Sequence, residues 1–401
     1  MQSPVAMRRS MALISTLLVA CTANASGDGP DLEAASDASM MDASVDALSE
    51  VSPEVSPGDV ATVDDSRPPP PPSPDAPPAS DSIAEGPDAP LEAGDAGPSR
   101  AALAKKKLVD FFGGISGHQT LAGIHNRHNA TPSEFTAQMH DITGKYPAFW
   151  SGDFLFESDD IAHRQQMIDQ AKVEWSHGAV VQLMFHACPP DVAEPCGWDP
   201  GLMHHPLSAA QWSDLTTDGG ALNKAWKSRL DLLVPFLRQL QDAGIAPLFR
   251  PHHEMNQGAF WWGGRTGPKG TLRLFQITHD YLVGTKGFDN IVWVWDVQDL
   301  SWDFDQYDPG ESYYDLAALD VYGGDGYTKA KYDAMVKVSP HRPIAIGECQ
   351  QLPTADLLLA QPRWTFFMGW SELVAANNGA DAIKALYTAS NVLTLDEMPA
   401  H

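Results

Sequence analysis

Eight short apolar runs, separated by helical segments, constrain the fold of this chain more than any other feature. The runs are 121–124, 148–152, 179–185, 245–250, 291–295, 317–321, 343–347 and 365–369. Helices are predicted between them over 133–142, 161–177, 221–243, 272–283 and 329–338, with a closing helix over 380–390. Strands that alternate with helices form parallel sheets. Eight such units in about 300 residues predict an α/β fold, a single (β/α)8 barrel.

The barrel accounts for only part of the 401 residues. Residues 1–21 carry Arg8 and Arg9, then a short apolar core, and end in Leu-Val-Ala-Cys21. This segment is too short to span a bilayer and is similar to a bacterial lipoprotein signal. We expect an exported protein that is anchored to the cell envelope by a lipid on Cys21. The alternative is simple cleavage of the signal, which would give an extracellular protein.

Residues 22–100 are predicted to be a disordered tether. They are rich in Ala, Ser, Asp and Pro and contain no aromatic residue. From 26 to 100 there are 17 acidic residues and two arginines, so this part carries 15 of the 26 net negative charges. It lacks the apolar surface needed to form a core. The barrel domain is therefore assigned to 101–401, and the acidic balance argues against nucleic acid as a partner.

Polar and aromatic residues follow every apolar run, at the strand ends where a barrel enzyme carries its active site. They are His125, Asp153, His186, Arg250, His253, Glu254, Trp293, Trp295, Asp296, Asp320, Tyr322, Glu348 and Trp370. The densest group follows the fourth run, where Arg250-Pro-His-His-Glu254 is followed by three aromatic residues. A carboxyl group beside flat aromatic faces suits a sugar, so Trp261 and Trp262 are candidate substrate-binding residues.

A second carboxyl group, Glu348, follows the seventh run. It lies 94 residues after Glu254, which is close to three barrel units at about 31 residues per unit. Strands three places apart in a ring of eight face each other across the mouth of the barrel. Glycoside hydrolysis generally uses two carboxyl groups that flank the scissile bond. The spacing therefore indicates a glycosidase.

These motifs resemble glycoside hydrolase family 26, a group of retaining (β/α)8-barrel enzymes dominated by endo-β-1,4-mannanases. The matching segments, within a resemblance that runs from about Gly117 to Trp370, are Arg250-Pro-His-His-Glu254, Phe260-Trp-Trp-Gly263, Asp320-Val-Tyr322 and Glu348. The resemblance implies that Glu254 is the acid/base and Glu348 the nucleophile. It also implies that Arg250 and Tyr322 hydrogen-bond to Glu348.

The resemblance further assigns the residues around the reactive sugar. Trp370 is expected to form the floor of its subsite, and the candidates for reading sugar hydroxyls are His186, Arg250, His253 and Asp320. One departure is Ala259, where many mannanases of the family carry a tryptophan five residues after the acid/base. The implied substrate is mannan or galactomannan, with β-1,3-xylan and mixed-linkage β-glucan as alternatives. A non-catalytic surface glycan-binding barrel is a further alternative.

The cysteines and histidines bear on metals, cofactors and disulfides. Cys188 and Cys196 flank a proline-rich loop and are predicted to form a disulfide in an exported protein, whereas Cys349 is expected to be a core thiol. No pair of cysteines shows the short spacing typical of a zinc site. A metal-dependent hydrolase built on the histidines leaves the tryptophans unexplained. We expect a monomer that requires no cofactor. Trp198, after the proline-rich loop, is expected to line a neighbouring subsite or to be a packing residue.

Overall fold

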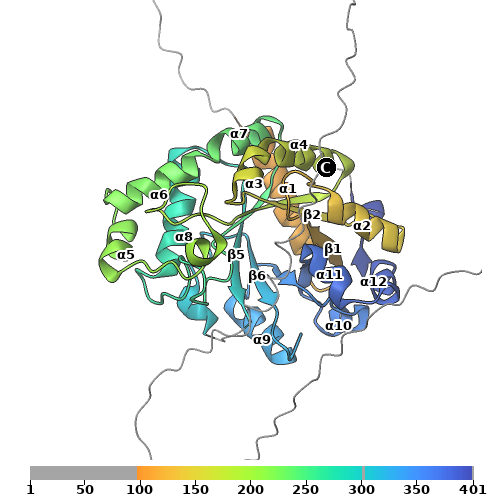
Figure 1. Ribbon diagram of the computed structural model, residues 1–401. Coiled ribbons are helices and arrows are strands. Elements are labelled where there is room, and N and C mark those ends of the chain that lie inside the picture. The colour runs from red at the N-terminus through yellow and green to blue at the C-terminus, as the bar shows by residue number, and fades with distance from the viewer. Residues whose placement is uncertain (1–96, 300–302, 400–401) are drawn as a thin grey trace, which may run out of the picture. The chain divides into compact units, whose positions relative to one another are not determined.

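The computed structural model of the chain describes residues 97–299 and 303–399. Its eight parallel strands close into a barrel, since each strand pairs with the next along the chain and β8 pairs with β1 (Figure 1). The strands are β1 Thr120–His125, β2 Phe149–Asp153, β3 Val180–Phe185, β4 Leu248–Pro251, β5 Val292–Gln298, β6 Leu316–Val321, β7 Ile344–Cys349 and β8 Trp364–Gly369. The predicted (β/α)8 barrel is confirmed, and every predicted strand is present.

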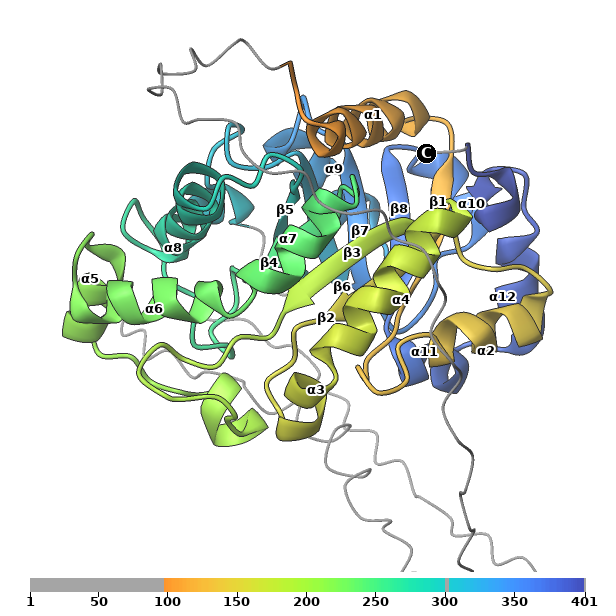
Figure 2. The same ribbon diagram turned by 90° about the horizontal axis from the view of Figure 1, so that it is seen from above.

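Helices surround the barrel (Figures 1 and 2). The α-helices are α1 Arg100–Ile115, α2 Glu134–Thr143, α3 Ser158–Ala162, α4 Arg164–His177, α5 Ala209–Thr216, α6 Ala221–Asp231, α7 Val234–Asp242, α8 Thr271–Asp280, α9 Lys329–Val338, α10 Ala355–Ala360, α11 Ser371–Asn377 and α12 Ala380–Tyr387. Short η2 to η5 segments are Trp198–Leu202, Tyr281–Thr285, Phe304–Tyr307 and Leu395–Glu397. A two-residue strand, β9 Val392–Leu393, pairs beside β1.

Two of the predicted helices are divided in the structure. The helix expected over 161–177 breaks at His163, whose φ of −104° and ψ of 9° depart from helical values. The helix expected over 221–243 becomes α6 and α7, because Pro235 occupies the first turn of α7 and cannot continue a helix from its N-terminal side. Helices α1, α5, α10 and α11 were not among the predicted elements.

Helix α1 covers one end of the barrel (Figure 2). Its buried side chains, Leu108, Phe112 and Ile115, join a core cluster with residues that begin strands, such as Phe149 and Leu248. The covered end is therefore the one at which the strands start, and the opposite end is left for the site. The predicted domain start at residue 101 falls inside this helix. The predicted signal segment 1–21, Cys21 and the tether up to residue 96 lie outside the described residues.

The helices within 97–299 and 303–399 include none that combines the length and the apolar character needed to cross a membrane.

Candidate active site

The turn after β4 carries Glu254 to the mouth of the barrel in a rare backbone conformation. His252 and Glu254 have φ values of 53° and 52°, a left-handed region that residues other than glycine seldom occupy. Hydrogen bonds hold the turn in place. The Glu254 N–H donates to Oδ1 of Asp296 at 2.8 Å, and the indole of Trp262 donates to the carbonyl of His253 at 2.8 Å. Such strain often marks functional sites.

Glu348 lies near the end of β7, and both of its carboxylate oxygens accept hydrogen bonds. Arg250 from β4 donates through Nη2 to Oε1. Tyr322, which follows β6, donates through its hydroxyl to Oε2 at 2.8 Å. The predicted contacts of Arg250 and Tyr322 with Glu348 are therefore present. They fix the orientation of the carboxylate and favour its charged form.

Arg250 is the centre of a buried ion cluster rather than a sugar contact. Its Nη1 lies 2.9 Å from Oδ2 of Asp296 and 2.9 Å from Oδ1 of Asp320. The side chains of these three residues have no exposed surface. The prediction that Arg250 and Asp320 read sugar hydroxyls needs correction, because neither can reach a hydroxyl directly. Arg250 holds Glu348 by a hydrogen bond, and Asp320 binds the same guanidinium.

The two glutamates differ in how strongly they retain a proton. Burial raises the pKa of Glu254 well above its ordinary value, and the negative charges of Glu348 and Asp296 raise it further. Burial also raises the pKa of Glu348, but there the positive charge of Arg250 opposes the rise. Arg250 thus favours the charged form of Glu348, whereas the neighbouring carboxylates favour the protonated form of Glu254.

Two histidines stand next to each other beside this pair. The ring centroids of His186 and His253 are 4.5 Å apart. Asp153, at the end of β2, accepts from the backbone N–H of His186 at 3.1 Å and contacts its Nδ1 at 2.5 Å. These contacts fix the orientation of the His186 ring. His186 is one of the residues predicted to bind a sugar hydroxyl. Burial lowers the pKa of His253 well below its ordinary value, so His253 meets a ligand as the neutral imidazole.

Trp370 is half-buried and lies where a sugar floor was predicted. Its ring stacks on His125 with centroids 4.3 Å apart and planes 20° apart, and it is 6.1 Å from the ring of His186. His125 is fully buried, and burial lowers its pKa to about 3. A neutral imidazole therefore supports the inner face of the indole. The accessible part of Trp370 is available for stacking on a sugar.

Trp261 and Trp262 differ from the expectation that they bind sugar. They are 3% and 0% exposed, so neither presents a face on which a sugar can stack. Trp261 donates to the carbonyl of Ala187 at 2.7 Å. Trp262 stacks under Phe260 with centroids 4.5 Å apart. Both are packing residues that support the turn holding Glu254. The ring of His253 contacts Phe260 and Trp262, with centroids 4.7 and 5.5 Å away.

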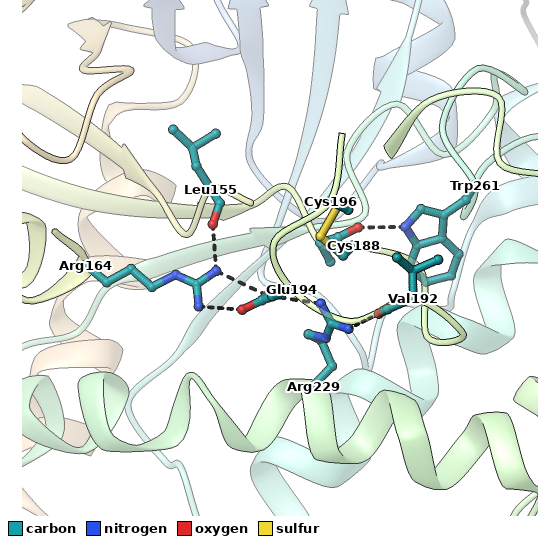
Figure 3. The surroundings of a disulfide bond; sticks show 9 residues. Leu155, Arg164, Cys188, Val192, Glu194, Cys196, Arg229 and Trp261 are labelled. Carbon is teal, nitrogen blue, oxygen red and sulfur yellow. Dashed lines mark hydrogen bonds and ion pairs between the residues drawn. A yellow bond between two sulfur atoms is a disulfide. The ribbon is translucent and has the colours of Figure 1, made fainter. Parts of the chain in front are cut away.

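A disulfide-closed loop lies on the β3 side of the site. Cys188 and Cys196 are bonded, as predicted, and Glu194 of the loop pairs with Arg164 and Arg229 at 3.0 and 3.2 Å (Figure 3). The following half-buried Trp198 lies 6.2 Å from His186 and 6.0 Å from Phe260 between ring centroids. The loop is thus fixed to α4 and α6, and Trp198 borders the histidines.

The remaining predicted features can also be placed. Cys349 is a buried free thiol, as expected. Ala259 is half-buried, and its carbonyl accepts from the N–H of His204 at 2.8 Å. No group of three or more His, Cys, Asp or Glu within the described part of the chain is arranged to hold a metal ion.

Two contacts of Glu254 did not follow from the sequence. Gln257 donates its side-chain amide to Oε2 of Glu254, and Asp296 accepts from the Glu254 backbone. Gln257 gave no signal beyond its position three residues after Glu254. Asp296 was recognised only as a polar residue at a strand end.

A (β/α)8 barrel whose mouth holds two glutamates, one bound by Arg250 and one with a pKa raised by burial and by neighbouring carboxylates, defines the class of glycosidases that work through two carboxyl groups. Residues 98–397 match the sequence profile of glycosyl hydrolase family 26. The chain belongs to this family, and the resemblance stated above is confirmed.

Several relatives within the family are similar over most of the barrel. A mannan endo-1,4-β-mannosidase of Thermothelomyces thermophilus is 29% identical over 324 residues, which are 75% of this chain and 62% of that protein. A Bacillus subtilis protein of the same description is 28% identical over 61% of this chain and 73% of its own length. The chain thus spans less than two thirds of the Thermothelomyces enzyme.

Solved structures agree with this grouping. GH26A from a Muricauda species is 34% identical with a TM-score of 0.70, and the match covers 74% of this chain and 97% of that one. The Podospora anserina GH26-CBM35 β-(1,4)-mannanase is 25% identical with a TM-score of 0.62, covering 77% of this chain and 71% of that one.

Proposed function

We propose that this chain is an endo-acting β-1,4-mannanase that hydrolyses mannan or galactomannan with retention of configuration. The observation that carries the proposal is that the two glutamate carboxyl groups have different hydrogen-bond donors. Arg250 and Tyr322 both donate to Glu348, whereas the Glu254 carboxyl accepts from the neutral amide of Gln257. This difference separates a nucleophile from an acid.

The reaction follows from these two states. The Glu348 carboxylate attacks the anomeric carbon, and Glu254 gives its proton to the glycosidic oxygen as the bond to the leaving sugar breaks. Glu254 is then ionised and removes a proton from water. The water oxygen attacks the anomeric carbon, which releases Glu348 and restores both glutamates. Two inversions at the same carbon give net retention.

The choice of mannose rests on relatives and on the polar groups beside Trp370. Both curated relatives described above are named mannan endo-1,4-β-mannosidases. Mannose differs from glucose in its axial 2-hydroxyl, which only a nearby polar group can distinguish. His186 lies beside Trp370 and next to His253, and these two histidines are the candidates for this contact. A site built to bind a hydroxyl strongly rejects an analogue without it.

A panel of soluble polysaccharides tests the proposal. Reducing ends and product lengths are measured on galactomannan, carboxymethyl cellulose, β-1,4-xylan, β-1,3-xylan and mixed-linkage β-glucan, with Glu348→Gln as the inactive control. Early release of mixed-length manno-oligosaccharides, with little activity elsewhere, is expected. Faster hydrolysis of β-1,3-xylan or mixed-linkage β-glucan than of galactomannan would show that mannan is not the preferred substrate. Binding without the release of reducing ends from any glycan would identify a glycan-binding barrel instead.

We also propose that the protein is exported, carries a lipid on Cys21 and acts as a monomer. The lipoprotein-like ending of residues 1–21 supports the first two points. Detergent phase partitioning of the wild type and of Cys21→Ser tests the anchor. The wild type should enter the detergent phase, and the variant should not. Light scattering coupled to gel filtration measures the oligomeric state.

A further inference from the structure

We infer that Asp296 is a positioning residue that ties the backbone of Glu254 to the arginine beneath Glu348. The inference rests on the proposed glycoside hydrolysis and adds a residue to it. Asp296 lies on β5 and is fully buried. One carboxylate oxygen accepts from the N–H of Glu254 at 2.8 Å, and the other accepts from Nη1 of Arg250 at 2.9 Å. A single rigid group thus joins the two halves of the catalytic pair.

Glu254 needs such an anchor because of its backbone. Its φ of 52° lies in a region that is unfavourable for a side chain with a Cβ. Asp296 holds the turn twice, since its own carbonyl also accepts from the N–H of Met255 at 3.3 Å. Release of these contacts lets the turn relax toward ordinary dihedral angles. The Glu254 carboxyl would then leave the glycosidic oxygen.

Arg250 in turn keeps Asp296 from moving. The guanidinium binds Asp296 and Asp320 through Nη1 and Glu348 through Nη2. It is planar and offers donors in fixed directions. The distance from the Glu254 backbone to the nucleophile is therefore set by a chain of buried, charged hydrogen bonds, which are stronger and more directional than neutral ones.

The chain also leaves space for this carboxylate on β7, two strands away from β5. Gly347 precedes the nucleophile, and a Cβ built there would lie 2.4 Å from Oδ2 of Asp296 and 2.4 Å from Oδ1 of Asp320. Its φ is not in the left-handed region, so close approach and not backbone conformation requires the glycine. The absence of a side chain at 347 lets two acidic groups meet Arg250 beside Glu348.

A residue that positions the acid affects some substrates more than others. Aglycones that leave as stable anions, such as 2,4-dinitrophenolate, need no proton, whereas phenol does. Removal of the Asp296 carboxylate should therefore lower kcat/KM for phenyl glycosides far more than for dinitrophenyl glycosides. A general loosening of the barrel would impair both equally. The kcat/KM ratio is the right measure because it reports on the first chemical step alone.

The experiment compares Asp296→Ala and Asp296→Asn with the wild type on phenyl and 2,4-dinitrophenyl β-mannobiosides. We expect Asp296→Ala to lower kcat/KM about 100-fold on the phenyl substrate and less than about fivefold on the other. Asp296→Asn keeps an oxygen for the Glu254 N–H, so its loss should be smaller. Both should move the basic limb of the pH profile to lower pH, because a negative charge beside Glu254 is gone.

Asp315→Ala is the matched control. Asp315 also accepts from a backbone N–H, that of Trp293 at 2.8 Å, and pairs with Lys105 at 2.9 Å, but it lies near the starting end of β5. The Asp315→Ala variant should change kcat/KM by the same factor on both substrates. Equal losses in the Asp296 variants, with an unmoved pH profile, would overturn the inference, as would wild-type rates. If Asp296→Ala does not fold, the test rests on Asp296→Asn, for which the same comparison of the two substrates and of the pH profile is made. A wild type inactive on both glycosides would instead overturn the proposed function.

Discussion

The hydroxyl of Tyr322 lies 2.8 Å from Oε2 of Glu348 and donates to it, while Arg250 donates to Oε1 of the same carboxylate. One donor is neutral and follows β6, and the other is cationic and lies on β4. Burial raises the pKa of Tyr322 well above its ordinary value, and the charge of Glu348 adds to this. The phenol therefore stays protonated as a donor throughout the working pH range.

Tyr322→Phe should lower kcat/KM about 10- to 100-fold. A hydrogen bond to a charged group contributes about 1.5–3 kcal/mol, and tenfold in rate corresponds to about 1.4 kcal/mol. Its loss also makes the Glu348 carboxylate easier to protonate, so the acidic limb of the pH–rate profile should move to higher pH. Rate measurements between pH 4 and 8 check both effects. An unshifted acidic limb would argue against Tyr322 as a donor to the nucleophile.

Chemical rescue should separate the two glutamates. In Glu348→Ala a small anion can enter the space of the missing carboxylate and attack the anomeric carbon. Azide should therefore restore turnover and give an α-mannosyl azide, the product of a single inversion. In Glu254→Ala, azide instead attacks the glycosyl-enzyme intermediate and gives the β-azide. Identification of the two anomers by NMR checks the roles, and exchanged anomers would reverse the assignment of acid and nucleophile.

The buried His252 should make stability depend on pH. Burial lowers its pKa to about 3 in the folded state, against about 6.5 in an unfolded chain. Folding therefore favours the neutral ring. The full contribution of the neutral His252 ring to the free energy of unfolding is present above pH 6.5. It is lost as the pH falls toward 3. Between pH 7 and 5 the expected loss is about 2 kcal/mol.

The replacement His252→Asn isolates this contribution, because asparagine tolerates the φ of 53° at this position. The variant loses the contact of the ring with Thr278 at 3.0 Å and should be less stable at pH 7. The difference in the free energy of unfolding between the variant and the wild type should be about 2 kcal/mol smaller at pH 5 than at pH 7. Urea unfolding at both pH values measures it. Replacement of the exposed His118 is the control. A constant difference at both pH values would contradict the prediction.

The disulfide should matter more for the subsite than for the chemistry. Replacing both Cys188 and Cys196 with serine opens a short loop and should lower the free energy of unfolding by roughly 2–3 kcal/mol. The ion pairs of Glu194 with Arg164 and Arg229 remain. We therefore expect a several-fold higher KM for polysaccharide with little change in kcat. A large fall in kcat with unchanged KM would show that the loop acts on Glu254 or Glu348 instead.

The sequence predicted the barrel because its signals are local. Apolar runs mark strands wherever they are buried on both sides. The interval between Glu254 and Glu348 agrees with their positions just after β4 and near the end of β7. Helix breaks were harder to foresee. Pro235 is a visible signal, but the break at His163 carries no proline or glycine and depends on the packing of α3 and α4.

The limits of sequence reasoning are clearest among the aromatic and charged residues of the site. Trp262 and Arg250 have side chains typical of sugar binding, yet both are fully buried. For Trp262 this depends on the turn that precedes it, whereas Arg250 is buried together with its ion-pair partners Asp296 and Asp320. Here the left-handed residues His252 and Glu254 redirect the chain after β4. No spacing rule indicated that reversal, so the two tryptophans were assigned to the wrong side of it.

Helix α1 has a practical consequence for trimming the protein. Ser99 caps the helix by accepting from the N–H of Ala102 at 2.9 Å, and it also donates to Asp289 at 2.8 Å. The cover of the barrel floor thus begins two residues before the boundary predicted from composition. An expression boundary placed just after Phe112 would remove this side chain from the floor and leave an aggregation-prone apolar surface, and one placed between Ser99 and Phe112 would remove the cap and the first part of the helix. A cut before Ser99 would leave the floor intact.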